Sequence, residues 1–205
     1  MWKARFTPAE RKVFQSLSAP AKVQDFVNSL PINFELQGAT CRSPRQVLRA
    51  GEAQCLEGAL LAACALQFHG HKPLLIDLRP YEPDVAHVVA LFQINRGFGA
   101  VSKTNHGVLR YREPVYRNVR ELVMSYFHEY FLDDGRKLLA DYAVVNLSRF
   151  DRLAWQTAGQ DLWYIDEYLN KVKHHKLLTL AQERGLRRAD PVEIALGKIV
   201  EWKNP

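Results

Sequence analysis

Long hydrophobic runs are missing from this chain of 205 residues. The longest unbroken apolar stretch covers residues 59–66, whereas a helix needs roughly 20 apolar residues to cross a bilayer. The first residues, Met-Trp-Lys-Ala-Arg-Phe-Thr-Pro, also lack the apolar core of a secretory signal. We therefore expect a cytoplasmic protein with no membrane contact.

Cysteine is scarce, with only Cys41, Cys55 and Cys64. An odd number of cysteines at irregular spacing argues against a disulfide framework. His69 and His71 are too sparse a pair to indicate a metal site. We expect no metal and no other cofactor.

Neither sign of charge dominates, since 28 Lys and Arg stand against 22 Asp and Glu. Residues 1–50 carry 8 basic and 3 acidic side chains, and residues 170–205 carry 8 and 4. The centre, residues 51–169, carries 12 basic and 15 acidic side chains. Because the basic groups at the two ends are dispersed, they are typical of a solvated surface, and nucleic acid is not the favoured partner.

The sequence has no repeat, low-complexity tract or clear linker. We therefore predict a single domain over residues 1–205. Helical extensions over residues 1–42 and 151–205 would flank a core region at 43–105. Residues 162–180 have the spacing of one long helix within the second extension.

Extended segments are predicted at residues 73–78, 86–94, 98–103 and 142–147. The second and third are joined by Asn95-Arg96-Gly97, a hairpin signal that makes these strands antiparallel. Strands and helices in these proportions indicate an α+β fold.

Cys55 begins an Ala- and Leu-rich segment that reads as a helix over residues 55–68. The helix is apolar on nearly every face, so it is expected to be packed on all sides. Backbone dipoles at a helix start favour a thiolate, which makes Cys55 a candidate nucleophile. The alternative is a buried cysteine that acts as a small hydrophobic residue. Cys64 lies half a revolution away and is assigned to the core.

His87 lies in an otherwise apolar strand, where burial is costly unless the ring has a partner. It is either the base that takes the proton of Cys55 or a satisfied core histidine.

A catalytic histidine needs a third group to fix its tautomer. Ser102 and Asn105 are the nearest candidates on the next strand. Asp77 and Asp84 are carboxylates close in sequence and remain open as alternatives.

In this order, the residues resemble the transglutaminase-like core of the papain-like cysteine enzyme superfamily. In that family a segment like residues 43–51 leads to the cysteine, the cysteine helix ends at a glycine (here Gly70), and a histidine opens the next strand (here His87). The resemblance covers residues 43–105. It implies a central helix carrying Cys55 that packs on an antiparallel sheet.

Three positions depart from the family pattern. Ala53 stands where glycine is usual, and Val89 stands where an aromatic residue is common. Ser102 occupies the position of the family's aspartate. Either Asn105 or a distant carboxylate then takes the place of the aspartate, or the activity is weak, or the fold is reused for binding.

The resemblance implies acyl chemistry on a peptide or amide substrate. Cys55 would form a thioester, and the Cys55 amide and the Gln54 side chain would stabilise the oxyanion. Water as acceptor makes the protein a peptidase or amidase, and an amine makes it an acyltransferase. The alternative is an inactive module of the same fold that contacts an acidic partner or nucleic acid through its basic ends. The oligomeric state is left open.

Overall fold

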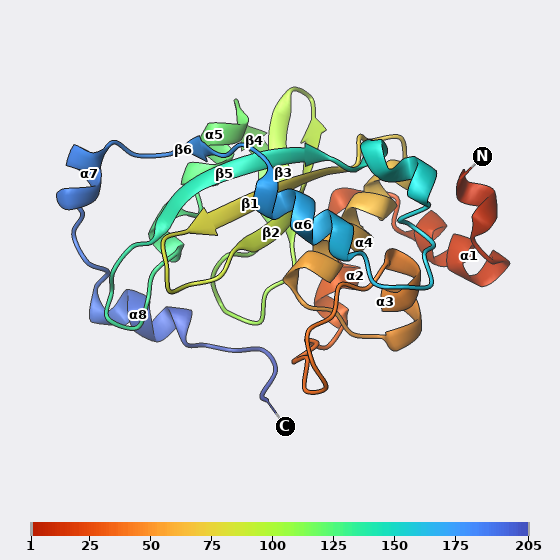
Figure 1. Cartoon of the computed structure of the whole chain (residues 1–205), viewed down its shortest axis with the longest axis horizontal. Coiled ribbons are helices and arrows are strands. Elements are labelled where there is room, and N and C mark those ends of the chain that lie inside the picture. Colours follow the sequence, from red (N-terminus) through yellow and green to blue (C-terminus); the bar gives the residue numbers. More distant parts are fainter. Residues whose placement is uncertain (1, 205) are drawn as a thin grey trace.

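A six-stranded sheet in the order β4-β3-β2-β1-β5-β6 forms the centre of the molecule (Figure 1). The computed structural model describes residues 2–204. Every neighbouring pair of strands is antiparallel. The strands are β1 (Leu74–Pro80), β2 (His87–Ile94), β3 (Gly97–Ser102), β4 (Arg112–Tyr116), β5 (Leu139–Asn146) and β6 (His175–Lys176).

Helices lie around the sheet, with α1 to α3 towards one end of the long axis and α7 and α8 towards the other (Figure 1). The α-helices are α1 (Pro8–Ser16), α2 (Pro20–Ser29), α3 (Pro44–Ala50), α4 (Cys55–Phe68), α5 (Val119–Met124), α6 (Trp163–Lys171), α7 (Leu180–Arg184) and α8 (Pro191–Gly197). The 3-10 helices are η1 (Trp2–Arg5), η2 (Phe127–Glu129) and η3 (Leu147–Leu153). The α+β class expected from the sequence is confirmed.

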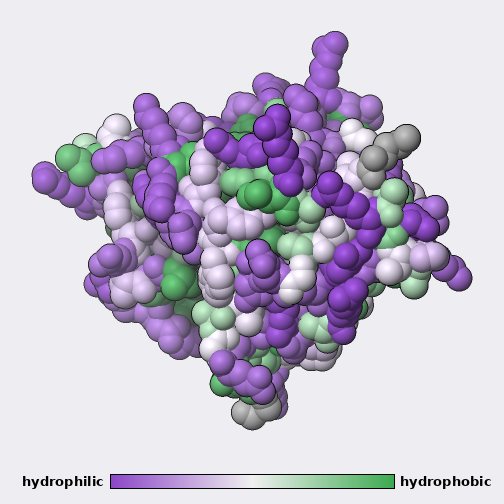
Figure 2. Space-filling view, turned by 45° about the vertical axis from the view of Figure 1, so that its right-hand side comes forward, coloured by the Kyte–Doolittle hydropathy of each residue, from purple (hydrophilic) through white to green (hydrophobic). Residues whose placement is uncertain are grey.

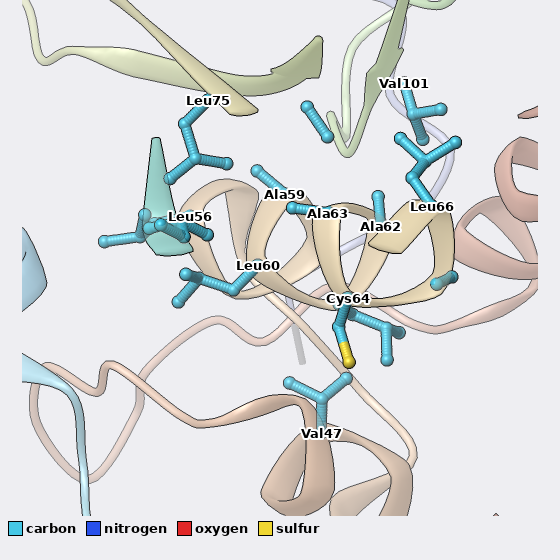
Figure 3. Close-up of a cluster of buried hydrophobic side chains, with 14 of the residues drawn as sticks. Val47, Leu56, Ala59, Leu60, Ala62, Ala63, Cys64, Leu66, Leu75 and Val101 are labelled. Atoms are coloured by element: carbon cyan, nitrogen blue, oxygen red, sulfur yellow. The ribbon is translucent and has the colours of Figure 1, made fainter. Parts of the chain in front are cut away.

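Helix α4 is enclosed by the rest of the molecule. All residues from Leu56 to Leu66 are buried, as an all-apolar helix requires. In Figure 3, Leu75 and Val101 of the sheet lie on one side of α4, and Val47 of α3 lies on the other beside Cys64. The start of α4 is therefore held in place by packing along the whole helix.

Both faces of the sheet are covered, because alternate side chains of a strand point to opposite sides. One face packs against α4 through a set of buried side chains: Leu75, Val88, Ala90, Phe92 and Val101. The other face packs against α5 and η2 through the intervening residues: Ile76, Leu78, Val89, Leu91 and Ala100.

The C-terminal extension is less helical than the sequence predicts. The single helix expected over residues 162–180 is wrong, because α6 ends at Lys171 and β6 then pairs with β5 at the sheet edge. Between them, the ring of His174 is buried with Nε2 2.9 Å from Oδ2 of Asp77. This tertiary contact outweighs the local helical periodicity.

Strand β4 was not expected from the sequence, since Pro114 lies within it. Proline is compatible with a strand at the edge of a sheet, and β4 is an edge strand. Among the described residues, every helix is too short or too polar to cross a membrane.

Candidate active site

Cys55 and His87 line one cavity of about 680 Å³. The cavity lies where α4 and β2 both begin. Its other walls come from three segments that are distant in sequence: 104–109, 129–134 and 194–198. The fold therefore brings the two residues singled out in the sequence to one hollow, although 31 positions separate them in the numbering.

Cys55 is the first residue of α4 and is partly exposed, whereas Cys41 and Cys64 are buried. The nearby backbone N–H groups of Val88 and Leu56 act to lower the pKa of its thiol. Burial has the larger effect, so the pKa of the Cys55 thiol is raised above its ordinary value. The thiolate that the helix start suggested is therefore not the resting form, because desolvation exceeds the stabilisation by the amides.

His87 is buried at the start of β2, with Nε2 2.8 Å from Oγ of Ser102. Burial and, to a smaller extent, the nearby ring of His106 lower the pKa of the imidazole to about 4. His87 is therefore neutral near pH 7, and one of its ring nitrogens carries a lone pair.

The hydroxyl of Ser102 determines which ring nitrogen of His87 carries the lone pair. Its oxygen lies 2.5 Å from the carbonyl oxygen of Leu109, which accepts the hydroxyl proton. A serine has only one proton to donate, so towards His87 the oxygen of Ser102 acts as acceptor. The ring is then protonated at Nε2, and Nδ1 keeps its lone pair.

Gln24 of α2 fixes the backbone of Ser102. Its amide nitrogen donates to the Ser102 carbonyl at 2.8 Å, and its amide oxygen accepts the Ser102 N–H at 2.9 Å. Gln24 is not among the residues predicted from the sequence. The available signal was a polar side chain beside Val23 and Val27 on the apolar face of a helix, where burial requires a partner.

Asn105 does not orient His87. Its amide nitrogen donates to the carbonyl of Trp202 at 2.9 Å, and its amide oxygen accepts the Trp202 N–H at 2.8 Å. Both ends of the side chain are thus engaged by the C-terminal segment, and the ring of His87 is bonded to Ser102 instead.

The two carboxylates considered from the sequence have separate positions. Asp77 points to the α4 side of the sheet and bonds His174. Asp84 lines the cavity, and its carboxylate accepts the N–H of Val85 in the loop before β2. Neither replaces Ser102 beside His87.

Gln54 caps α4 rather than facing the cavity. Its amide oxygen accepts the N–H of Leu56 at 2.6 Å, and its amide nitrogen donates to the carbonyl of Thr40 at 3.2 Å. Glu57 completes the cap by accepting the Gln54 N–H at 3.0 Å. The Gln54 side chain is therefore already committed, which leaves the backbone N–H of Cys55 as the donor at the start of α4.

One wall of the cavity comes from the C-terminal segment, a placement that no local sequence pattern indicates. Ile194, Gly197 and Lys198 line the cavity. The segment is held by a hydrogen bond from the Gly107 N–H to the Ile199 carbonyl at 2.8 Å. Access to Cys55 therefore depends on a part of the chain that lies about 140 residues further on.

The residues that line the cavity are not arranged to hold a metal. Across residues 2–204, no group of three or more His, Cys, Asp and Glu side chains is placed to ligate an ion.

No family model matches the chain, and no curated protein is similar to it in sequence. Among solved structures, calcium-bound Legionella pneumophila LapG is similar at 22% identity and a TM-score of 0.38. That match covers 49% of this chain and 63% of LapG. EGTA-treated LapG gives 18% identity and a TM-score of 0.36, over 49% of this chain and 66% of LapG. The chain thus spans less than two thirds of LapG, and at these TM-scores the likeness carries no conclusion about function.

Proposed function

We propose that this protein is a transglutaminase-like cysteine hydrolase or acyltransferase that acts on a peptide or amide through a thioester on Cys55. The observation that carries the proposal is the shared cavity of Cys55 and His87, combined with the contact between Nε2 of His87 and Ser102. A partly exposed thiol and an oriented imidazole are the two groups that acyl transfer to sulfur needs.

In the proposed reaction, His87 acts as a general base rather than as part of a resting ion pair. As the sulfur of Cys55 attacks the substrate carbonyl, Nδ1 of His87 accepts the thiol proton. The carbonyl π electrons move to oxygen, and the oxyanion forms close to the backbone N–H groups at the start of α4. This order suits a thiol of raised pKa beside a neutral imidazole.

The intermediate then collapses to the thioester. The C–N bond breaks, and the leaving amine takes the proton from the imidazolium of His87. Neutral His87 next removes a proton from the acceptor, either water or a second amine. The acceptor attacks the thioester carbonyl, and the Cys55 sulfur leaves and regains the proton.

Ser102 orients the ring in this scheme but brings no charge. A carboxylate at its position would stabilise the imidazolium through each transfer. With a serine hydroxyl there, the imidazolium is a short-lived species, and the reaction is expected to be slower than with a carboxylate.

A second candidate function is a non-catalytic binding module of the same fold. The raised pKa of Cys55 and the lowered pKa of His87 favour it, because both groups are neutral at rest. A nucleic-acid partner has less support. Basic side chains are paired with acidic ones, as in Arg45 with Glu10 at 3.0 Å, and hydrophilic residues are spread over the face in Figure 2.

Acyl transfer from an activated ester separates the two functions. The full chain is incubated with p-nitrophenyl acetate, and the acetylated residue is identified by peptide mass spectrometry. We expect acetyl on Cys55 at early times, and slower acetylation in His87→Gln but not in His71→Gln, a control outside the cavity. Acetylation spread over surface lysines, with Cys55 unmodified, would support the binding module.

A further inference from the structure

Leu109 has a backbone conformation that leucine rarely adopts. Its φ is +59°, in the left-handed region, where a side chain with a Cβ is disfavoured. The same residue supplies the carbonyl that accepts the proton of Ser102 at 2.5 Å. Such a conformation persists only where its surroundings hold it, so the contacts around Leu109 matter for His87.

Glu129 of η2 is the group that holds Leu109. One carboxylate oxygen, Oε2, accepts the Leu109 N–H at 2.7 Å. The other, Oε1, lies 2.6 Å from the guanidinium of Arg112. Arg112 is fixed in turn, since its Nε donates to Oγ of Ser125 at 2.9 Å and its guanidinium lies 4.2 Å above the ring of Tyr126.

The N–H and the C=O of Leu109 belong to adjacent peptide groups on one α-carbon. The bond to Glu129 anchors the peptide group on one side of this α-carbon, so that only the φ and ψ of Leu109 lie between the anchored N–H and the C=O. In the observed arrangement that carbonyl faces Ser102. Glu129 also lines the cavity.

We propose that Glu129 is a positioning residue for His87, which acts through Leu109 and Ser102 to keep the imidazole proton on Nε2. When the Leu109 carbonyl faces Ser102, the hydroxyl proton is taken, and the serine oxygen accepts the Nε2–H of His87. When the carbonyl turns away, the hydroxyl is free to donate to Nε2. The ring proton then belongs on Nδ1, and the lone pair needed at that nitrogen is lost.

Three variants of the full chain separate this role from a structural one. Glu129→Ala removes the acceptor for the Leu109 N–H, and Glu129→Gln keeps an acceptor oxygen. Glu113→Ala, an exposed glutamate on the neighbouring β4, is the matched control. The readout is the ¹⁵N chemical shifts of the His87 ring, assigned with His87→Gln, which distinguish the two tautomers directly.

We expect the Nε2–H form in the unmodified chain, Glu129→Gln and Glu113→Ala, and a shift towards the Nδ1–H form in Glu129→Ala. If Glu129→Ala does not fold, Leu109→Val provides a second test. A β-branched residue is strained at positive φ, so the same shift is expected. An unchanged tautomer in a folded Glu129→Ala or Leu109→Val chain would overturn the proposal.

The consequence for Cys55 rests on the proposed function, whereas the tautomer does not. We expect Glu129→Ala to slow acetylation of Cys55 at pH 7.5 roughly tenfold or more, since general-base catalysis is lost. A tautomer shift without any change in acetylation would leave the positioning role intact and count against His87 as base. Slow acetylation in His87→Gln, together with an unchanged His87 tautomer in Glu129→Ala, would support His87 as the base and overturn the positioning role of Glu129.

Discussion

The hydroxyl of Ser102 accepts a hydrogen bond from Nε2 of His87 at 2.8 Å, because its own proton is donated to the Leu109 carbonyl at 2.5 Å. A neutral serine thus stands where a charged orienter would stabilise an imidazolium. Burial, and to a smaller extent the ring of His106, lower the pKa of His87 to about 4, and the serine brings no charge that would offset them.

Ser102→Asp is expected to raise the pKa of His87, because a carboxylate beside the ring favours its protonated form. The value is measured by NMR titration of the His87 ring. The new carboxylate also faces the Leu109 carbonyl, so we expect a loss of about 1–3 kcal/mol of stability at neutral pH. Ser148→Asp, an exposed site in η3, is the control. A His87 pKa that stays near 4 in a folded Ser102→Asp chain would contradict this prediction.

The stability of the chain is expected to fall in acid partly because of His87. Folding lowers the pKa of the ring from 6.5 to about 4, so the unfolded chain takes up the proton first as the pH decreases. The contribution of His87 to stability is complete above pH 6.5, declines between pH 6.5 and about 4, and falls no further below that. The stability that His87 contributes, and that is lost across this pH range, is about 3 kcal/mol.

Urea unfolding at several pH values measures this effect. The quantity compared is the free energy of unfolding of the unmodified chain and of His87→Gln. Glutamine does not titrate but can still donate to Ser102, so it preserves the local hydrogen bond. The two stability curves should converge as the pH falls from 6.5 to 4. Curves that stay parallel across this range would indicate that the ring titrates alike in the folded and unfolded chains.

Gly58→Ala is expected to destabilise the protein, although alanine is the better helix former. An added Cβ would lie 2.4 Å from Cβ and 2.8 Å from Cγ of Lys103, which is buried and bonds the Leu30 carbonyl through Nζ. We expect a loss of about 1–3 kcal/mol from overpacking, compared with a gain of about 1 kcal/mol at an open helical site. Urea unfolding of Gly58→Ala is compared with that of Gly159→Ala, which adds its Cβ to open space. Equal or increased stability of Gly58→Ala would contradict the close approach of α4 to Lys103.

The features that the sequence predicts well are those set by local patterns. The hairpin at Asn95-Arg96-Gly97 joins β2 and β3 as expected, and the apolar segment after Cys55 is a buried helix. Alternation along β2 also places Val89 and Leu91 on one face of the sheet, where both pack in the second core. Each of these depends on residues that are close in the chain.

The features that the sequence could not predict depend on contacts between distant segments. Gln24 and Glu129 act on Ser102 and Leu109 from other elements, and no spacing rule links them. The pKa of Cys55 depends on how much water the fold removes, which a helix-start argument does not include. No sequence pattern predicts the positive φ of Leu109, because glycine or asparagine is the usual residue in the left-handed region.

Site-resolved alkylation is the sharpest test of whether Cys55 is a nucleophile served by His87. The full chain is labelled with iodoacetamide between pH 6 and 10, and the rate at each cysteine is followed by peptide mass spectrometry. Cys55 is partly exposed, while burial raises the pKa of Cys41 to about 12 and that of Cys64 well above its ordinary value. We predict that Cys55 reacts much faster than either and that its rate rises with pH without a plateau near neutrality, because its own pKa is raised. We also predict that His87→Ala slows labelling near pH 7. Equally slow labelling of all three thiols, or a Cys55 rate that is indifferent to His87→Ala, would contradict the account.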